Sequence, residues 1–197
     1  SFANNHRFSY CGCKPAITSV FIGATALVAD FNGVGKAPHI QEEIADLEAT
    51  AEIVYAAGIA ASVDGKLTPS GAWEPNFLYT NCGRYHAGKK IMHEYETLIA
   101  VTGGFAATIP FEGDWINPET KGYMEKYIMR NPKYTAEEQH RLFRFLDDFT
   151  VSPWCGMEMS AGIHGGGSPI MEQIGIRSNY DIEGKKNIVK RLAGIQK

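Results

Sequence analysis

The densest group of chemically reactive side chains lies near the start of the chain. His6, Tyr10, Cys11, Cys13 and Lys14 place an imidazole, a phenol, two thiols and an ammonium within nine positions. Thiolates and imidazoles are the ligands that zinc and iron–sulfur sites use. The His-x6-Cys spacing is typical of neither a zinc finger nor a ferredoxin. Two interpretations stay open: ligation of a metal or cluster, or packing cysteines beside a surface histidine.

A second group lies around a glycine-rich segment, Gly165-Gly166-Gly167, which follows His164. Successive glycines let a ligand approach the main chain closely, and a helix opening at Ser168-Pro169 favours an anion. Glu158 lies in an apolar window, where desolvation raises a carboxyl pKa toward the range of a general base. The alternative is a flexible turn beside a surface glutamate. The pattern does not favour a nucleotide phosphate loop of the usual kind, because it has neither a Walker lysine motif nor a strand before the glycines.

A third group, Thr102-Gly103-Gly104, follows an apolar helical pattern. A hydroxyl and two small residues could lie against a cofactor. A glycine that ends a helix is the alternative explanation.

The elements that would position these groups are helices. Apolar residues spaced by three and four predict helices, and no alternating strand pattern is found. The fold class we expect is all-α, a helical bundle with three long antiparallel helices. The expected helices cover residues 14–33, 38–64, 85–101, 118–130 and 136–149, and a last helical region follows Pro169; residues 65–83 are expected to form a loop.

Composition narrows the function classes. The chain has 197 residues, a net charge of −3 and four cysteines. This charge gives no basic face for nucleic acid or anionic lipid, and no apolar run reaches the roughly 18 residues of a membrane span. Four unevenly spaced cysteines are too few for a disulfide scaffold, so we expect a reducing, cytoplasmic location. The N-terminus has no features of a signal peptide and no initiator Met, as expected for a processed subunit, a split gene product or a domain of a longer protein.

Several motifs together resemble one family: His6-x3-Tyr10-x2-Cys13-Lys14, the alanine-rich helix after Pro38, and the segments 102–104, 164–169 and 181–186. They are similar to the C-terminal part of the 4-hydroxybutyryl-CoA dehydratase family, which also has vinylacetyl-CoA Δ-isomerase activity. This family belongs with the flavin-dependent 4-hydroxyphenylacetate 3-monooxygenases, which share the acyl-CoA dehydrogenase fold. The resemblance implies an all-α domain like the C-terminal domain of that fold.

The resemblance also implies roles for the first group. His6 and Cys13 would be two of four ligands to a [4Fe-4S] cluster, and a cysteine pair from the preceding part of the enzyme would complete it. Tyr10 and Lys14 would line the space between cluster and flavin and take part in catalysis with His6. Cys11 is the other possible ligand, but Cys13 keeps the family spacing and the following lysine. The resemblance thus divides the chain into a ligand-bearing segment, 1–13, and a helical domain, 14–197.

The other two groups would serve the flavin and the acid–base chemistry. The family places a glutamate near the glycine-rich turn, and Glu158 is the candidate, with Glu172 as the alternative. FAD would be shared across subunits of a homotetramer. The residues expected to contact FAD are Thr102, Gly103, Gly104, His164, Gly165 and Gly166.

The function implied is radical dehydration of a CoA thioester, 4-hydroxybutyryl-CoA, to crotonyl-CoA. The chain would be a lyase with isomerase activity only together with the N-terminal part of the enzyme, and inactive alone. Two alternatives are a flavin-dependent monooxygenase relative without a cluster and a non-catalytic helical domain that oligomerises.

Overall fold

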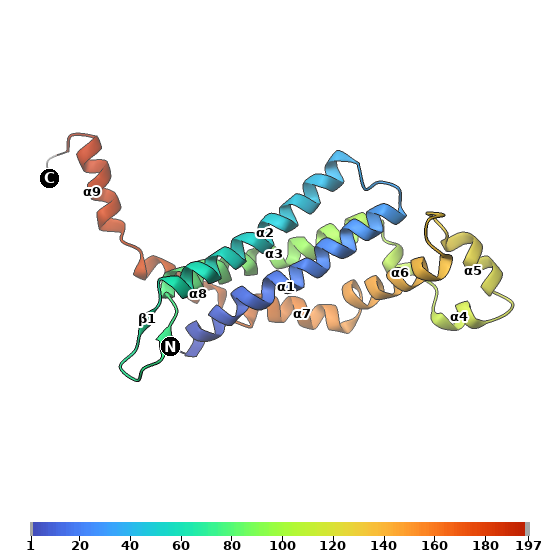
Figure 1. Cartoon of the computed structure of the whole chain (residues 1–197), viewed down its shortest axis with the longest axis horizontal. Coiled ribbons are helices and arrows are strands. Elements are labelled where there is room, and N and C mark those ends of the chain that lie inside the picture. Colours follow the sequence, from blue (N-terminus) through green and yellow to red (C-terminus); the bar gives the residue numbers. More distant parts are fainter. Residues whose placement is uncertain (1, 196–197) are drawn as a thin grey trace.

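The computed structural model describes residues 2–195, and helices dominate it (Figure 1). Three long helices form its centre: α1 (Phe2–Phe31), α2 (Pro38–Val63) and α3 (Phe77–Thr102). The expected all-α bundle is confirmed. The shorter elements are β1 (Lys66–Leu67), β2 (Trp73–Glu74), a 3-10 turn (Phe105–Thr108), α4 (Glu112–Ile116), α5 (Lys121–Ile128), α6 (Ala136–Thr150), α7 (Pro153–His164), α8 (Pro169–Asn179) and α9 (Ile182–Leu192).

The three long helices run up, down and up, and each packs against the other two. α7 and α8 pack against α3, and α6 joins the far end of the bundle (Figure 1). Aromatic rings connect α1, α3 and α6. The ring of Phe21 on α1 lies edge-on to Tyr95 of α3, with 4.8 Å between the ring centroids, and is tilted against Phe149 of α6, with 4.9 Å between them. This packing fixes the face of α1 that carries the reactive side chains.

α1 begins earlier than the apolar pattern predicts. The expected start at residue 14 is wrong, since the helix already begins at Phe2 and continues through Pro15. Its buried stripe upstream consists mainly of polar residues, so hydrophobic periodicity does not reveal it. The stripe runs through Asn4, Arg7, Cys11, Lys14 and Thr18. The division between segments 1–13 and 14–197 therefore falls inside one helix.

Several shorter elements were not predicted, among them α7 and the strands β1 and β2. α7 begins at Pro153, where Ser152 Oγ accepts a hydrogen bond from Trp154 N at 3.2 Å. Proline is compatible with a first helical position, where its missing N–H would have no partner. The expected loop contains an antiparallel pair of short strands, Lys66 opposite Glu74, and the start of α3.

α1 is also long and apolar enough, by length and composition alone, to cross a membrane. Its most apolar 18-residue window has a mean hydropathy of 1.4, and 39% of that window is buried inside the protein. The central helix of a bundle meets the same criterion. α1 packs against both α2 and α3, and this contact accounts for apolar residues such as Phe21 and Val28; α1 also buries the charged Arg7 and Lys14 in the bundle.

Candidate functional site

His6, Tyr10 and Cys13 lie on one face of α1. Residues spaced by four and three in a helix share a face, and seven residues span about 10 Å along the axis. His6 and Cys13 are exposed and Tyr10 is half-buried. An imidazole and a thiol therefore point from the same side of one helix, about two turns apart, with the phenol between them.

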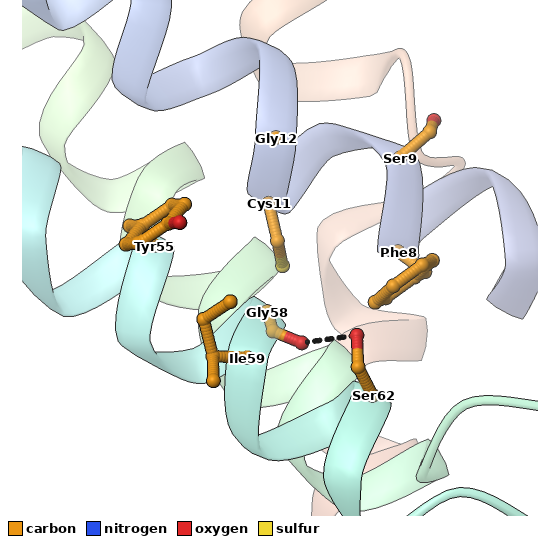
Figure 2. A pocket seen from close by; sticks show the side chains of 8 residues that line it. All are labelled: Phe8, Ser9, Cys11, Gly12, Tyr55, Gly58, Ile59 and Ser62. Carbon is orange, nitrogen blue, oxygen red and sulfur yellow. Dashed lines mark hydrogen bonds between the residues drawn. The ribbon is translucent and has the colours of Figure 1, made fainter.

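Cys11 points away from this face. Two residues along a helix turn the side chain by about 200°, and Cys11 is buried between α1, α2 and α3. Its Sγ lies 4.0 Å from the carbonyl oxygen of Thr80 on α3, and burial raises its pKa to about 11. Figure 2 shows Cys11 pointing from α1 toward α2, in an apolar groove that Tyr55 and Ile59 also line. His6 and Cys13 therefore lie on the same exposed side of α1, and Cys11 lies on its buried side.

Tyr10 is fixed at both ends of its side chain. Its hydroxyl donates to the carbonyl oxygen of Gly162 on α7 at 3.3 Å, and the guanidinium carbon of Arg84 lies 4.3 Å from the ring centroid. Burial raises the pKa of Tyr10 to about 12, although the Arg84 cation opposes this shift. Tyr10 therefore keeps its proton at neutral pH.

Lys14 faces the interior of the bundle. Its ammonium forms an ion pair with Glu94 of α3, and Thr18 Oγ1 donates to the other carboxylate oxygen at 2.7 Å. Desolvation lowers the pKa of Lys14, and the charge of Glu94 opposes that shift. Lys14 is only one position beyond Cys13, but its ammonium is held on the core side of α1.

The glycine-rich turn between α7 and α8 is held by two buried arginines. Arg7 Nε donates to the carbonyl oxygen of Gly166 at 2.8 Å, and Arg84 Nη2 donates to that of Ile163 at 2.8 Å. Gly166 is buried, whereas His164 and Gly165 are exposed. Neither arginine was predicted as a site residue. For Arg7 the sequence held one signal, since it lies on the stripe of polar residues that α1 buries.

The two candidate glutamates lie in different surroundings. Glu172 is 1% exposed and its Oε1 is 3.5 Å from Arg84 Nε. Desolvation raises the pKa of Glu172, and Arg84 and Arg7 oppose this shift. Glu158 is half-buried on α7, one turn before Gly162, and so lies on the side of α7 that meets Tyr10. Glu158 therefore lies near Tyr10, whereas Glu172 lies in the core against Arg84.

The segment Thr102-Gly103-Gly104 lies at the other end of the bundle. α1 and α3 run parallel, because Asn81 contacts the start of α1 and Asn32, just after the end of α1, contacts Val101. Thr102 is buried and its hydroxyl donates to Ile99 O at 2.7 Å. Gly103 and Gly104 are exposed, with φ values of 66° and 77° that glycine adopts readily, and they end α3. Within one chain this segment does not meet the face that carries His6 and Cys13.

Sequence comparison finds one family along nearly the whole chain. The family described as 4-hydroxyphenylacetate 3-hydroxylase C terminal (HpaB) matches residues 1–194. The chain is 31% identical, over 99% of its length, to the 4-hydroxybutyryl-CoA dehydratase/vinylacetyl-CoA-Δ-isomerase of Clostridium aminobutyricum, of which it covers 41%. It is 26% identical to the oxygenase component of a 4-nitrophenol monooxygenase from Rhodococcus opacus, over 68% of this chain and 25% of that protein. The chain thus spans well under half the length of these relatives.

Solved structures show the same fold. An oxygen-tolerant archaeal 4-hydroxybutyryl-CoA dehydratase from N. maritimus superposes with a TM-score of 0.91 at 31% identity, covering 100% of this chain and 39% of that one. The oxygenase component HpaB of 4-hydroxyphenylacetate 3-monooxygenase, in complex with FAD and 4-hydroxyphenylacetate, superposes with a TM-score of 0.87 at 23% identity over 94% of this chain and 39% of that one.

Proposed function

Because the chain belongs to the 4-hydroxyphenylacetate 3-hydroxylase C-terminal family, we propose that it is the C-terminal part of a flavin-dependent enzyme that dehydrates 4-hydroxybutyryl-CoA. The single observation that carries this proposal is the shared, exposed face of His6 and Cys13 on α1. A flavin monooxygenase requires no such pair of ligands. The identity to the Clostridium dehydratase over nearly the whole chain supports the same choice.

The donor set on α1 fits an iron–sulfur cluster. His6 and Cys13 would supply an imidazole and a thiolate, and a cysteine pair from the rest of the enzyme would supply the remaining ligands. Both side chains are free of hydrogen-bonded side-chain partners among residues 2–195. When bound, the cluster would provide a Lewis-acidic iron and FAD the one-electron chemistry that an unactivated β-hydrogen needs.

The residues of this chain would handle protons around the substrate. Dehydration to crotonyl-CoA requires removal of the α-proton and of the β-proton, a donor for the γ-oxygen that leaves as water, and return of one proton to the γ-carbon. Glu158 is the base we propose, because it lies on the side of α7 that faces Tyr10. Tyr10 is the donor, since its raised pKa keeps the phenol protonated at neutral pH. The ammonium of Lys14 would contribute its positive charge from the core side of α1, where it is paired with Glu94.

We further propose that each flavin is shared between copies of the chain. Thr102–Gly104 and His164–Gly166 lie at different ends of the bundle, so one copy does not bring both to one cofactor. A homotetramer in which the end of α3 from one copy meets the glycine-rich turn of another would do so.

The test compares three alanine variants of the complete enzyme, in which this chain is joined to its N-terminal part. His6→Ala and Cys13→Ala should lose cluster iron and dehydratase activity, because each removes one ligand. Cys11→Ala is the matched control: it removes a buried thiol two residues away and should keep both iron and activity. Full iron content in the Cys13→Ala protein would remove the ligand assignment. Oxygen-dependent hydroxylation of a phenol by iron-free protein would favour the monooxygenase alternative.

A further inference from the structure

Arg84, a residue of α3, contacts three other helices, α1, α7 and α8. It is fully buried on α3. Its guanidinium lies over the ring of Tyr10 on α1, donates to the carbonyl oxygen of Ile163 in the last turn of α7, and lies 3.5 Å from Glu172 of α8. A single side chain thus connects the helix that carries the proposed ligands to both helices that flank the glycine-rich turn.

Glycines occupy the positions next to this guanidinium where a side chain would collide with it. A Cβ added at Gly166 would lie 2.6 Å from Arg84 Nε, and one added at Gly88 would lie 2.6 Å from Arg84 Nη1. A Cβ at Gly162 would lie 3.4 Å from the Tyr10 hydroxyl and 2.7 Å from Ile91. Real Cβ atoms do not approach other atoms as closely as 2.6 Å. These glycines therefore provide the space in which Arg84 and Tyr10 lie.

We propose that Arg84 is a positioning residue that sets the orientation of Tyr10 toward the face of His6 and Cys13. The cation holds the ring from one side. The same guanidinium binds a carbonyl at the C-terminus of α7, where helix carbonyls have no partner within the helix, and the neighbouring carbonyl of Gly162 accepts the Tyr10 hydroxyl. Arg84 thus fixes both the ring and the acceptor of its hydroxyl.

An arginine suits this position better than a lysine. A guanidinium is planar, stacks on aromatic rings and donates in a fixed fork, whereas an ammonium is a compact point charge. Arg84 Nε and Nη1 form no hydrogen bond among the described residues, so the stacking contact, the Nη2 bond and the ion pair with Glu172 hold the guanidinium in place. The role of Tyr10 in the reaction rests on the proposed function; its placement by Arg84 does not.

The placement is tested with the tyrosines of this chain replaced by 3-fluorotyrosine and observed by fluorine NMR. The chain has nine tyrosines, and the resonance lost in Tyr10→Phe identifies Tyr10. Arg84→Lys keeps the positive charge and removes the planar guanidinium. Gly166→Ala keeps Arg84 but adds a methyl group that would lie 2.6 Å from its Nε, so the side chain must move. Both should shift the Tyr10 resonance by more than its linewidth and leave the exposed tyrosines unmoved.

Gly156→Ala is the control, because a Cβ there meets nothing within 4 Å and the residue lies on the same helix, α7. It should leave the Tyr10 resonance in place. An unchanged Tyr10 resonance in a folded Arg84→Lys or Gly166→Ala protein would overturn the proposal. If Arg84→Lys does not fold, Gly166→Ala decides, since it leaves the charges intact.

A second measurement separates this proposal from the proposed function. In the complete enzyme, Gly88→Ala, whose added Cβ would lie 2.6 Å from Arg84 Nη1, should lower kcat on 4-hydroxybutyryl-CoA about tenfold to a hundredfold with KM within about twofold, as expected for a misplaced catalytic group. Iron content should stay unchanged. A shifted Tyr10 resonance with unchanged kcat would support the placement and contradict the catalytic role of Tyr10.

Discussion

The ammonium of Lys14 and the carboxylate of Glu94 form an ion pair wholly inside the protein, between α1 and α3. Thr18 donates to the same carboxylate, so two residues of α1 hold one acid of α3. Removing charges from water is costly, and their attraction compensates only while both partners are present. The pair therefore joins α1 to α3 one position beyond Cys13, beside the reactive face of α1.

Removing one partner should be far more costly than removing a partner of an exposed pair. Glu94→Gln leaves the Lys14 ammonium buried without its counter-charge, and we expect the free energy of unfolding to fall by about 3–5 kcal/mol. Asp46→Asn is the control, because its ion pair with Lys90 also joins α2 to α3 but is partly exposed, and the expected loss is below about 1 kcal/mol. Urea denaturation measures both. Equal losses in the two variants would contradict a structural role for the buried pair.

The sequence predicts the long helices wherever their buried stripe is apolar. α2 begins at Pro38 as expected, and the capping box of α6 forms, with Glu138 N donating to Thr135 Oγ1 at 3.1 Å. The start of α1 was missed because Arg7 and Lys14 occupy its buried positions. Their partners are distant in sequence, so periodicity holds no information about them.

The candidate site also contains residues that sequence spacing can place and residues that it cannot. His6, Tyr10 and Cys13 were expected to precede the first helix, and their spacing of four and three gives one shared face only because α1 already begins at Phe2. Arg84 and its glycines could not be found in this manner. Their relationship depends on three segments separated by more than seventy positions, such as Arg84 and Ile163, 79 apart.

The four cysteines should react with iodoacetamide in an order that their burial sets. Cys13 is exposed, whereas Cys11 and Cys155 are buried. Burial raises the pKa of Cys11 to about 11, so at pH 8 about one molecule in a thousand has the Cys11 thiolate, the species that reacts. We expect Cys13 to be alkylated at least about tenfold faster than Cys11, as measured by mass spectrometry of the digested chain over time. Faster labelling of Cys11 would show that the packing of α1 against α2 and α3 is wrong.

Alanine at Gly83 and at Gly23 should have opposite effects. A Cβ at Gly83 would lie 2.7 Å from Cys11 Sγ and 2.9 Å from Ala57 Cβ, so Gly83→Ala should lower the free energy of unfolding by about 1–3 kcal/mol. At Gly23, in the interior of α1, a Cβ meets nothing within 4 Å. Gly23→Ala should raise stability by up to about 1 kcal/mol through helix propensity alone. Thermal unfolding followed by circular dichroism measures both, and a neutral Gly83→Ala would argue against close contact between α2 and α3.

Glu172 should make the stability of the protein depend on pH. Its folded pKa is raised above the ordinary value of 4.5, because burial disfavours the carboxylate more than Arg84 and Arg7 favour it. The folded state therefore holds this proton to higher pH than the unfolded chain does. The stability that this group contributes is complete below about pH 4.5 and is lost as the pH rises through the folded pKa.

The free energy of unfolding of the wild type, minus that of Glu172→Gln, should thus decrease as the pH is raised from 4.5 to 7, because glutamine does not titrate. Urea denaturation at several pH values gives this difference. Glu183→Gln, which removes an exposed carboxylate of α9, is the matched control for the loss of one negative charge. If the difference for Glu172→Gln instead grew with pH, Arg84 would be stabilising the ionised carboxylate more strongly than burial opposes it, and the ion pair would dominate this part of the core.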